Sequence, residues 1–445
     1  MRISLRALAL GALLVATTPA YSADLVIWWT KGISAQEDQL LRDAVSTWEA
    51  ATGKTADLSF YASGDVAKKT LAALEAGEPP DLTFDFNYDL AYSPTWAYEG
   101  KLADVSDVLD PIQDLFESAA LQSVEMENGL SGTRSYYAIP WTQMTPMIHY
   151  WGDLLEEAGF TDSDVPDQWL PFFTFWCDSF QPAIRKTGSR MYGLGQGSSS
   201  ASNDSFFNIH MWLKAYGVDV LTPDGELTLT DPAVRERTIE AMTTYVQPIL
   251  DECAPPDAMT WKGADDNTGF LNKQFMLEMN PTLSIPISLL PDQEDVYHNV
   301  MRTVPWPHAV DGSPMPALVS VKQALIFQTS PHQDNAKDFM RHLLQPEVIG
   351  AILRGGGGRF TPVMPDLLAD PFYSDPADPH LSAMYKTFTQ GTNLPYPHAY
   401  NRLYAKVMSQ GTWQQGIGRV VVDGLTVDQA VDEIIARISD ILAGK

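Results

Sequence analysis

Residues 135–151 read SYYAIPWTQMTPMIHYW, and their pattern of apolar runs and prolines is the strongest indication of architecture in the chain. Two prolines separate an apolar, β-prone run at 136–139 from a second run at 147–150. Proline lacks an amide donor and forces its predecessor into extended geometry, so the segment predicts strand, break, strand. We interpret the break as a crossing between two lobes, with residues 141–145 lining the cleft between them. The alternative is a proline-bent strand within one domain.

The length of the chain also favours two lobes. At 445 residues it exceeds the roughly 250–300 residues at which a single hydrophobic core stops growing. A hydrophobic content of 45% with 19% charged residues predicts an ordered protein that buries a core. The formal net charge of −27 repels phosphate backbones and anionic lipids, so nucleic acid and membrane surfaces are not expected as partners.

The N-terminus has the features of a cleavable signal peptide. Residues 1–22 contain two arginines, an apolar run and small residues at the −3 and −1 positions of a cleavage site after Ser22. No cysteine follows the site, so a lipid anchor there is not expected. We therefore expect a freely soluble, exported protein, located in the periplasm of a diderm bacterium.

Strands and helices are predicted to alternate over residues 24–84. Strand-like runs at 24–30, 56–61 and 81–84 are separated by helical patterns, and Ser34 with Glu37 forms a capping box for the first helix. Such alternation predicts a parallel sheet covered by helices, whose ligands bind beyond the carboxyl ends of the strands. The residues just past those ends are therefore candidate ligand contacts.

Three proline- or glycine-marked interruptions, near 140–146, 304–316 and 354–362, divide the chain into four blocks. If each is a crossing, alternate blocks share a lobe. The predicted fold is α/β, a two-lobed clamshell in which each lobe is a mainly parallel sheet flanked by helices. The predicted bounds are a signal peptide at 1–22, a first lobe at 23–140 and 309–356, a second lobe at 146–304 and 362–445, and crossings at 141–145, 305–308 and 357–361.

Two features leave alternatives open. Cys177 and Cys253 are the only cysteines, and in an oxidising compartment they could form a disulfide or remain two buried thiols. The glycine run at 355–358 could be a flexible hinge turn, which we favour, or an anion site beside Arg354 and Arg359.

Catalytic and metal motifs are missing from the sequence. The eight histidines show no HExxH spacing and no zinc-ligand pattern, and no G-x-S-x-G motif occurs. We therefore expect no metal, no cofactor and no enzyme activity. Paired carboxylates for glycoside cleavage depend on spatial separation, which sequence alone does not reveal.

Several segments, in their order along the chain, resemble the family 1 extracellular solute-binding proteins, the family of maltose-binding protein. These segments are DLVIWWTKG, the helix ending EAATGK, GEPPDLTFDFN, YYAIPWTQMTPMIHYW, the helix ending EEAGF and GLTVDQAVDEI. The resemblance extends from about residue 24 to residue 445. It implies a periplasmic-binding-protein clamshell and a partner permease of a carbohydrate ABC importer in the inner membrane.

The resemblance also implies where a ligand is contacted: after the first strand, after the PPD strand, at the first crossing and from loops of the second lobe. The sequence departs from sugar binders in having Gln143 and Met144 where a carboxylate often follows the crossing proline, and Asp85 where maltose-binding protein has an aromatic. The candidate ligand-binding residues are Trp29, Lys31, Asp85, Asn87, Tyr88, Trp141, Thr142, Gln143, Ser199, Asn203, Phe206, Trp261, Asn280 and Arg359.

Together these observations predict a monomeric binding protein that closes on a carbohydrate or related polyol and delivers it to a permease. Asp85 and the acidic charge favour a polyamine as an alternative solute, and Arg359 with the glycine run favours a sulfonated or phosphorylated sugar. An exported glycan-processing enzyme is the alternative from another functional class.

Overall fold

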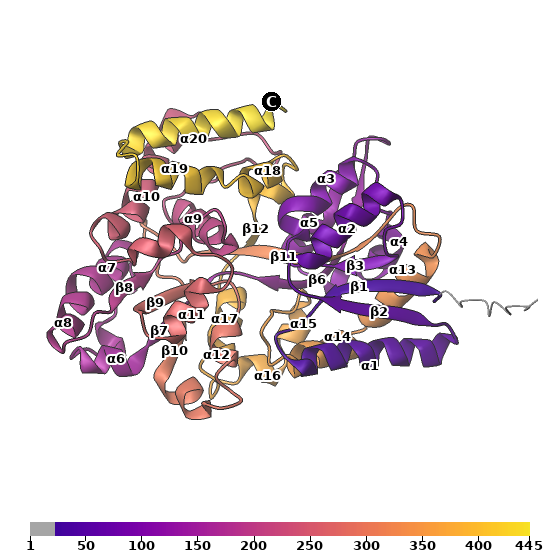
Figure 1. Cartoon of the computed structure of the whole chain (residues 1–445), viewed down its shortest axis with the longest axis horizontal. Coiled ribbons are helices and arrows are strands. Elements are labelled where there is room, and N and C mark those ends of the chain that lie inside the picture. Colours follow the sequence, from indigo (N-terminus) through magenta and orange to yellow (C-terminus); the bar gives the residue numbers. More distant parts are fainter. Residues whose placement is uncertain (1–22) are drawn as a thin grey trace, which may run out of the picture.

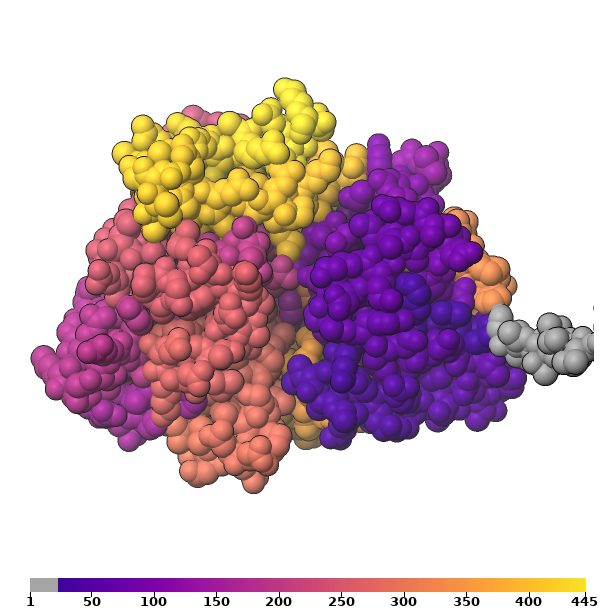
Figure 2. All heavy atoms as spheres, in the orientation of Figure 1, coloured from indigo at the N-terminus to yellow at the C-terminus, as the bar shows by residue number. Residues whose placement is uncertain are grey.

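The chain folds into two lobes that meet along a furrow (Figures 1 and 2). The computed structural model describes residues 23–445, so the expected signal peptide at 1–22 lies outside the described residues. Each lobe has its own β-sheet and its own large cluster of buried apolar side chains. The two-lobed α/β fold predicted from the sequence is confirmed.

The first lobe is built on a six-stranded sheet with the order β12-β11-β3-β1-β2, in which β6 pairs with β11 outside this path. The parallel pairing of β1 with β2 and β3 places their carboxyl ends on one edge, as the alternation predicted. The strands are β1 (Leu25–Thr30), β2 (Ala56–Tyr61), β3 (Leu82–Phe84), β6 (Ile139–Met144), β11 (Ala317–Ile326) and β12 (Asn393–Pro395).

Helix α1 (Ala35–Thr52) illustrates how local sequence positions the first lobe. The Ser34 hydroxyl accepts the amide of Glu37 at 3.2 Å, and Gly53 ends the helix with a φ of 73°. The buried side chains of α1 are Leu41, Ala44, Val45 and Trp48. The other helices and the hairpin of this lobe are α2 (Asp65–Ala76), α3 (Ser93–Tyr98), α4 (Ser106–Leu109), α5 (Ser118–Val124), α13 (Gln333–Leu343), α14 (Pro346–Gly355), β4 (Glu125–Asn128) and β5 (Thr133–Tyr136).

The second lobe contains a four-stranded sheet with the order β10-β7-β9-β8. Only β8 and β9 are parallel, whereas β7 runs antiparallel to both β9 and β10. The prediction of a mainly parallel sheet was therefore wrong for this lobe, because β7 enters from the first lobe and its direction is fixed by that crossing. The strands are β7 (Met147–Trp151), β8 (Tyr192–Gly195), β9 (Phe275–Asn280) and β10 (Met301–Val304).

Helices surround this second sheet, and the C-terminal helices cover its upper side in Figure 1. Cys177 and Cys253 are joined by a disulfide within this lobe. The helices are α6 (Gly152–Glu157), α7 (Trp169–Thr174), α8 (Gln181–Lys186), α9 (Asn203–Ala215), α10 (Pro232–Leu250), α11 (Asp265–Leu271), α12 (Ser284–Ile287), α18 (Tyr404–Ser409), α19 (Thr412–Val421) and α20 (Val427–Leu442).

The chain passes between the lobes at three places. Only Thr145 and Pro146 separate β6 of the first sheet from β7 of the second, and residues 305–316 connect β10 to β11. After α14, buried side chains of the helices α15 (Pro365–Leu368), α16 (Pro371–Ser374) and α17 (Leu381–Thr389) still belong to the first core. Tyr396 then joins the second core, so the third passage follows β12.

The predicted third crossing at 357–361 therefore precedes a segment that still packs with the first lobe. Gly357 and Gly358 have φ angles of 72° and 70°, which reverse the chain at the end of α14. The glycines turn the chain within the first lobe because the apolar face of α17 is buried there.

Candidate functional site

The first lobe contributes an aromatic cavity beyond the carboxyl ends of β1 and β3. The rings of Trp29 and Phe84 are stacked with centroids 4.5 Å apart, and Trp141 of β6 meets Trp29 edge-on at 5.5 Å. Phe86 also lines this cavity. Flat rings of this kind offer surface for the apolar face of a ring-shaped ligand.

A guanidinium and a carboxylate share the same cavity. Nη1 of Arg359 lies 3.5 Å from Oε2 of Glu37, and the two side chains are only 7% and 16% exposed. Burial raises the pKa of Glu37, and the charge of Arg359 opposes that shift. Nε of Arg359 and Oε1 of Glu37 are buried and have no partner among the described residues. The pair therefore keeps hydrogen-bonding capacity for a ligand while its net charge is zero.

The second lobe contributes three neighbouring carboxyl groups, which we call the acidic cluster: Asp204, Asp266 and Glu278. Asp204 lies in the first turn of α9, Asp266 lies in the first turn of α11, and Glu278 lies in β9. Glu278 and Asp266 are buried to 1% and 2% exposure. Three separate elements thus contribute the acidic cluster, which lies near the carboxyl ends of the parallel strands β8 and β9.

Burial and mutual repulsion determine the protonation of the acidic cluster. Burial raises the pKa of Glu278 well above its ordinary value, and the carboxylates of Asp266 and Asp204 add to the rise. Burial likewise raises the pKa of Asp204, and the nearby carboxyl of Asp266 raises it further. The cluster is therefore an electrostatically unfavourable group of acids that a donor-rich ligand would stabilise.

Amides and one aromatic ring complete the second-lobe surface. Trp261 stacks on Phe275 with centroids 5.3 Å apart. The Nδ2 of Asn280 donates to Oδ1 of Asn267 at 3.0 Å, and Oδ1 of Asn280 accepts the amide of Thr282. These bonds order the loop that follows β9 beside the acidic cluster.

Two hydrogen bonds across the seam show that the lobes are closed on one another. Nδ2 of Asn203 donates to Oδ1 of Asn87 at 2.9 Å. The amide of Leu283 donates to the carbonyl of Arg359 at 3.2 Å. These bonds bring the start of α9, which carries Asp204, to the first lobe, and the loop after β9 to Arg359 of the aromatic cavity.

Lys322 of β11 lies on the first-lobe side, close enough to the acidic cluster that its charge lowers the pKa of Asp204 against the effect of burial. Its Nζ lies 3.1 Å from the carboxylate of Asp89, and both side chains are almost fully buried, at 0% and 1% exposure. The same ammonium donates to the Phe86 carbonyl at 2.9 Å and to Oγ of Ser320 at 2.8 Å. Its three N–H donors are therefore already used within the first lobe.

Seven of the fourteen candidate residues line the aromatic cavity, bond across the seam or pack in the second lobe near the acidic cluster. The structure brings together the aromatic and amide groups predicted from both lobes and adds the predicted guanidinium. These residues are Trp29, Asn87, Trp141, Asn203, Trp261, Asn280 and Arg359.

Two of the other candidates are held by their own lobe. The carboxylate of Asp85 accepts amides of Gly64 at 3.2 Å and Asn87 at 2.9 Å, so it orders the turn before α2. The hydroxyl of Tyr88 bonds Thr70 and Thr83 in the first core, at 2.9 and 2.8 Å.

The remaining five candidates occupy varied surroundings. Gln143 donates to Glu117 at 3.0 Å and to the Pro362 carbonyl at 2.9 Å, where the chain segments of the first lobe meet. The hydroxyl of Ser199 accepts the amide of Ala201, and Lys31 is exposed. Thr142 is buried with an unpartnered hydroxyl, and Phe206 packs in the second core.

Sequence analysis missed Glu37, Phe86, Lys322 and the whole acidic cluster. A charged residue within an apolar run was the available indication for two of them, since Glu278 interrupts FMLEMN and Lys322 interrupts ALVSVKQALI. Asp204 and Asp266 occupy first turns of helices, where acidic residues are common for local reasons.

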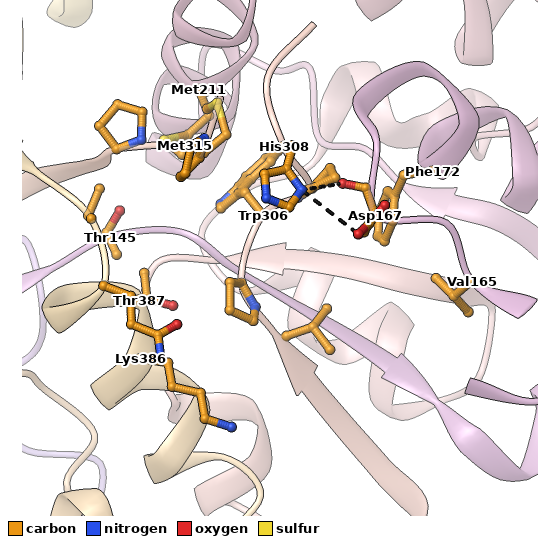
Figure 3. Close-up of a pocket in the computed structure, with 18 of the residues that line it drawn as sticks. Thr145, Val165, Asp167, Phe172, Met211, Trp306, His308, Met315, Lys386 and Thr387 are labelled. Carbon is orange, nitrogen blue, oxygen red and sulfur yellow. Dashed lines mark hydrogen bonds and ion pairs between the residues drawn. The ribbon is translucent and has the colours of Figure 1, made fainter. Parts of the chain in front are cut away.

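A second cavity of about 380 Å³ is lined in part by the passages between the lobes (Figure 3). The first two passages contribute Thr145 and Trp306 to its lining, and α17 of the first lobe contributes Thr387. Its charged groups, such as Asp167 and Lys386, are exposed rather than buried. Because it lacks the buried charged groups of the seam, we place the candidate site at the seam.

Within residues 23–445, no cluster of three or more histidine, cysteine or acidic side chains has an arrangement that could hold a metal ion. No helix in this part of the chain combines the length and apolar character of a membrane span.

Comparison with protein families gives one match that covers most of the chain. The model of the bacterial extracellular solute-binding proteins matches residues 43–383. A lactose-binding protein of Rhizobium radiobacter is 24% identical over 255 residues. That alignment covers 55% of this chain and 54% of the relative, so the chain spans about half the length of the curated relative that it matches.

Solved structures resemble nearly the whole chain in fold. An ABC transporter solute-binding protein of Thermotoga lettingae, bound to α-D-tagatose, has a TM-score of 0.76 at 20% identity, covering 94% of this chain and 99% of its own. A cyclic α-maltosyl-1,6-maltose-binding protein of Arthrobacter globiformis has a TM-score of 0.73 at 18% identity, covering 95% and 99%. At these identities the likeness concerns the fold.

Proposed function

The chain belongs to the bacterial extracellular solute-binding protein family, and we propose that it is the substrate-binding component of an ABC importer for a carbohydrate or related polyol. The single observation that carries the choice of solute is the pairing of an aromatic half-site with a carboxylate and amide half-site across the seam. The half-sites differ because a sugar presents two kinds of surface, apolar C–H faces and a belt of hydroxyl groups.

The proposed mechanism is closure of the lobes around the solute. In an open state, the two half-sites are separate and accept ligand from solvent. Closure brings Asn203 to Asn87 and the loop after β9 to Arg359, so that ligand contacts from both lobes form together. The closed form would then deliver the solute to the permease without breaking a covalent bond.

Location and partner follow from the same proposal. The sequence features of residues 1–22 support export by a cleavable signal peptide. The family is described as extracellular, and we propose the periplasm as the compartment and an inner-membrane permease as the partner.

The site favours a carbohydrate over two of the alternatives. A sulfonated or phosphorylated sugar would require an unpaired cation, whereas Arg359 already faces Glu37 and Lys322 already faces Asp89. A glycan-processing enzyme would turn over its substrate. Incubation of the purified protein with candidate glycans, followed by product analysis, would detect turnover and refute a purely binding role.

Closure is tested by small-angle scattering combined with a thermal-shift screen of sugars and polyols. A bound solute should raise the melting temperature by mass action and decrease the radius of gyration. A solute that binds without compaction would contradict the closure mechanism.

The aromatic half-site is tested by Trp141→Ala. Loss of a buried aromatic contact should weaken binding of the identified sugar by about thirty-fold, corresponding to about 2 kcal/mol. Trp28→Ala is the matched control, because Trp28 packs on Tyr61 with centroids 5.8 Å apart and is not among the cavity residues. Equal affinities of the two variants would argue against a role of the aromatic cavity in binding.

A further inference from the structure

The acidic cluster lacks a cation within the described part of the chain. None of Asp204, Asp266 and Glu278 takes part in an ion pair among residues 23–445, although Asp266 and Glu278 are buried. Oδ1 of Asp266 accepts the amide of Asn267 at 2.8 Å, and the side chains of Asp266 and Asp204 hydrogen-bond each other, which leaves Oε2 of Glu278 without a partner. Buried carboxylates are normally paired, so this cluster is incomplete as it stands.

The unsatisfied atoms around the cluster point to the missing partner. Oε2 of Glu278 is buried without a hydrogen-bond partner, and so are Oγ of Ser205 and Oδ1 of Asn208. Ser205 directly follows Asp204 in α9, and Nδ2 of Asn208 already donates to the Met279 carbonyl next to Glu278, at 3.4 Å. The amide oxygen of Asn208 and an ionised Glu278 can only accept, and the hydroxyl of Ser205 can accept or donate, so a donor would satisfy all three atoms.

The protein's own cations cannot fill this place. The nearest, Lys322, has all three N–H donors engaged by Asp89, Ser320 and the Phe86 carbonyl. Arg359 is matched by Glu37 in the aromatic cavity. The second-lobe side of the seam therefore has buried acids with no cation of the protein to stabilise their charged forms, and a cation for them has to come from the ligand.

We infer that the solute is a saccharide with a free amino group, whose ammonium binds between Asp204, Asp266 and Glu278 while its sugar ring lies toward Trp29 and Trp141. This inference rests on the proposed function and specifies its substrate class. An ammonium supplies three donors for the orphaned oxygens and one positive charge that would stabilise the ionised form of the acids. The aromatic half-site favours a ring over a linear polyamine, because flat rings stack on the C–H face of a sugar.

The experiment compares ligands that differ only at the amino group. Glucosamine, galactosamine and mannosamine, with the β-1,4-linked dimer of glucosamine, are each titrated calorimetrically at pH 7 beside the parent sugar and the N-acetyl derivative. At least one free amine should bind about tenfold or more tightly than both of its neutral counterparts. If every neutral member binds as tightly as its amine, or if no amine binds, the inference is overturned.

Isosteric variants locate the preference. Glu278→Gln and Asp266→Asn each remove an acid that could ionise against the ammonium, and should reduce the ratio of amine to neutral affinity from tenfold or more toward one. Glu236→Gln on the exposed face of α10 makes the same chemical change elsewhere and should leave the ratio unaltered. An unaltered ratio in both cluster variants would assign the preference to another part of the molecule.

The outcomes separate this inference from the proposed function. Binding of neutral sugars with compaction, and without preference for amines, would overturn the inference and leave the proposed function standing. Binding of putrescine or spermidine with no binding of any saccharide would overturn both.

Discussion

The two lobes treat buried charge in opposite ways. The first lobe pairs two of its buried acids with cations, since Asp89 faces Lys322 and Glu37 faces Arg359. The second lobe groups three acids at the seam and provides no cation for them among the described residues. The difference indicates that these charges of the first lobe are balanced without ligand, whereas the second lobe maintains an unfavourable arrangement that a ligand would relieve.

The largest expected effect concerns the paired charges. Lys322→Met should lower the free energy of unfolding by about 3–5 kcal/mol, because it leaves Asp89 buried without a counter-charge. Chemical denaturation measures the change. The double variant Lys322→Met with Asp89→Leu should recover most of the loss, since replacing both partners leaves no unpaired charge. A single variant as stable as the parent would show that the first lobe does not depend on the pair.

An effect of opposite sign is expected in the acidic cluster. Glu278→Gln should raise the free energy of unfolding of the ligand-free protein at pH 7 by about 1–2 kcal/mol, because it removes a buried acid that its neighbours disfavour. Thermal unfolding measures the change, with Glu236→Gln as control.

The pH dependence of this gain has a definite sign. The pKa of Glu278 in the folded protein is raised, so the destabilisation due to its ionisation grows as pH rises from the unfolded-state pKa, about 4.3, toward the folded value. The advantage of Glu278→Gln should therefore disappear below about pH 4. A gain that persists undiminished in acid would show that it arises from packing rather than charge.

The smallest expected effect concerns buried histidines of the second lobe. Burial lowers the pKa of His210 from 6.5 to about 3, and its Nε2 lies 2.9 Å from the hydroxyl of Tyr404. Between these two pKa values the unfolded chain binds the extra proton, so stability falls as pH falls. From pH 7 to pH 6 this histidine should account for about 0.7 kcal/mol of lost stability.

His210→Asn should abolish that part of the slope in denaturant titrations at several pH values. His308→Asn, at a side chain that is 40% exposed, is the control. If the two variants have identical pH slopes, the proposed acid sensitivity of the second core does not come from His210.

The sequence was sufficient to predict the two lobes, the first crossing and the aromatic half-site. Trp29 and Trp141 follow from proline punctuation and from the position of strand ends, which are local properties of the chain. Arg359 was named together with the glycine run, yet its pairing with Glu37 joins residues far apart in sequence.

The acidic cluster could not be predicted for the same reason, because Asp204, Asp266 and Glu278 come from three elements. Conversely, Asp85 and Tyr88 have the sequence position expected of ligand contacts, but nearby amides and hydroxyls satisfy them. Strand direction in the second sheet likewise depends on how β7 enters it, which no local pattern encodes.

The disulfide between Cys177 and Cys253 spans a sequence separation of 76, and that loop contains β8 and all of α9. The covalent bond therefore encloses the segment that carries Asp204 and Asn203. Protein produced in a reducing cytoplasm would fold without this disulfide. A weak or missing ligand response from such material would then result from the reduced cysteines. Production by secretion into an oxidising compartment should preserve the disulfide, and thiol titration checks that it has formed.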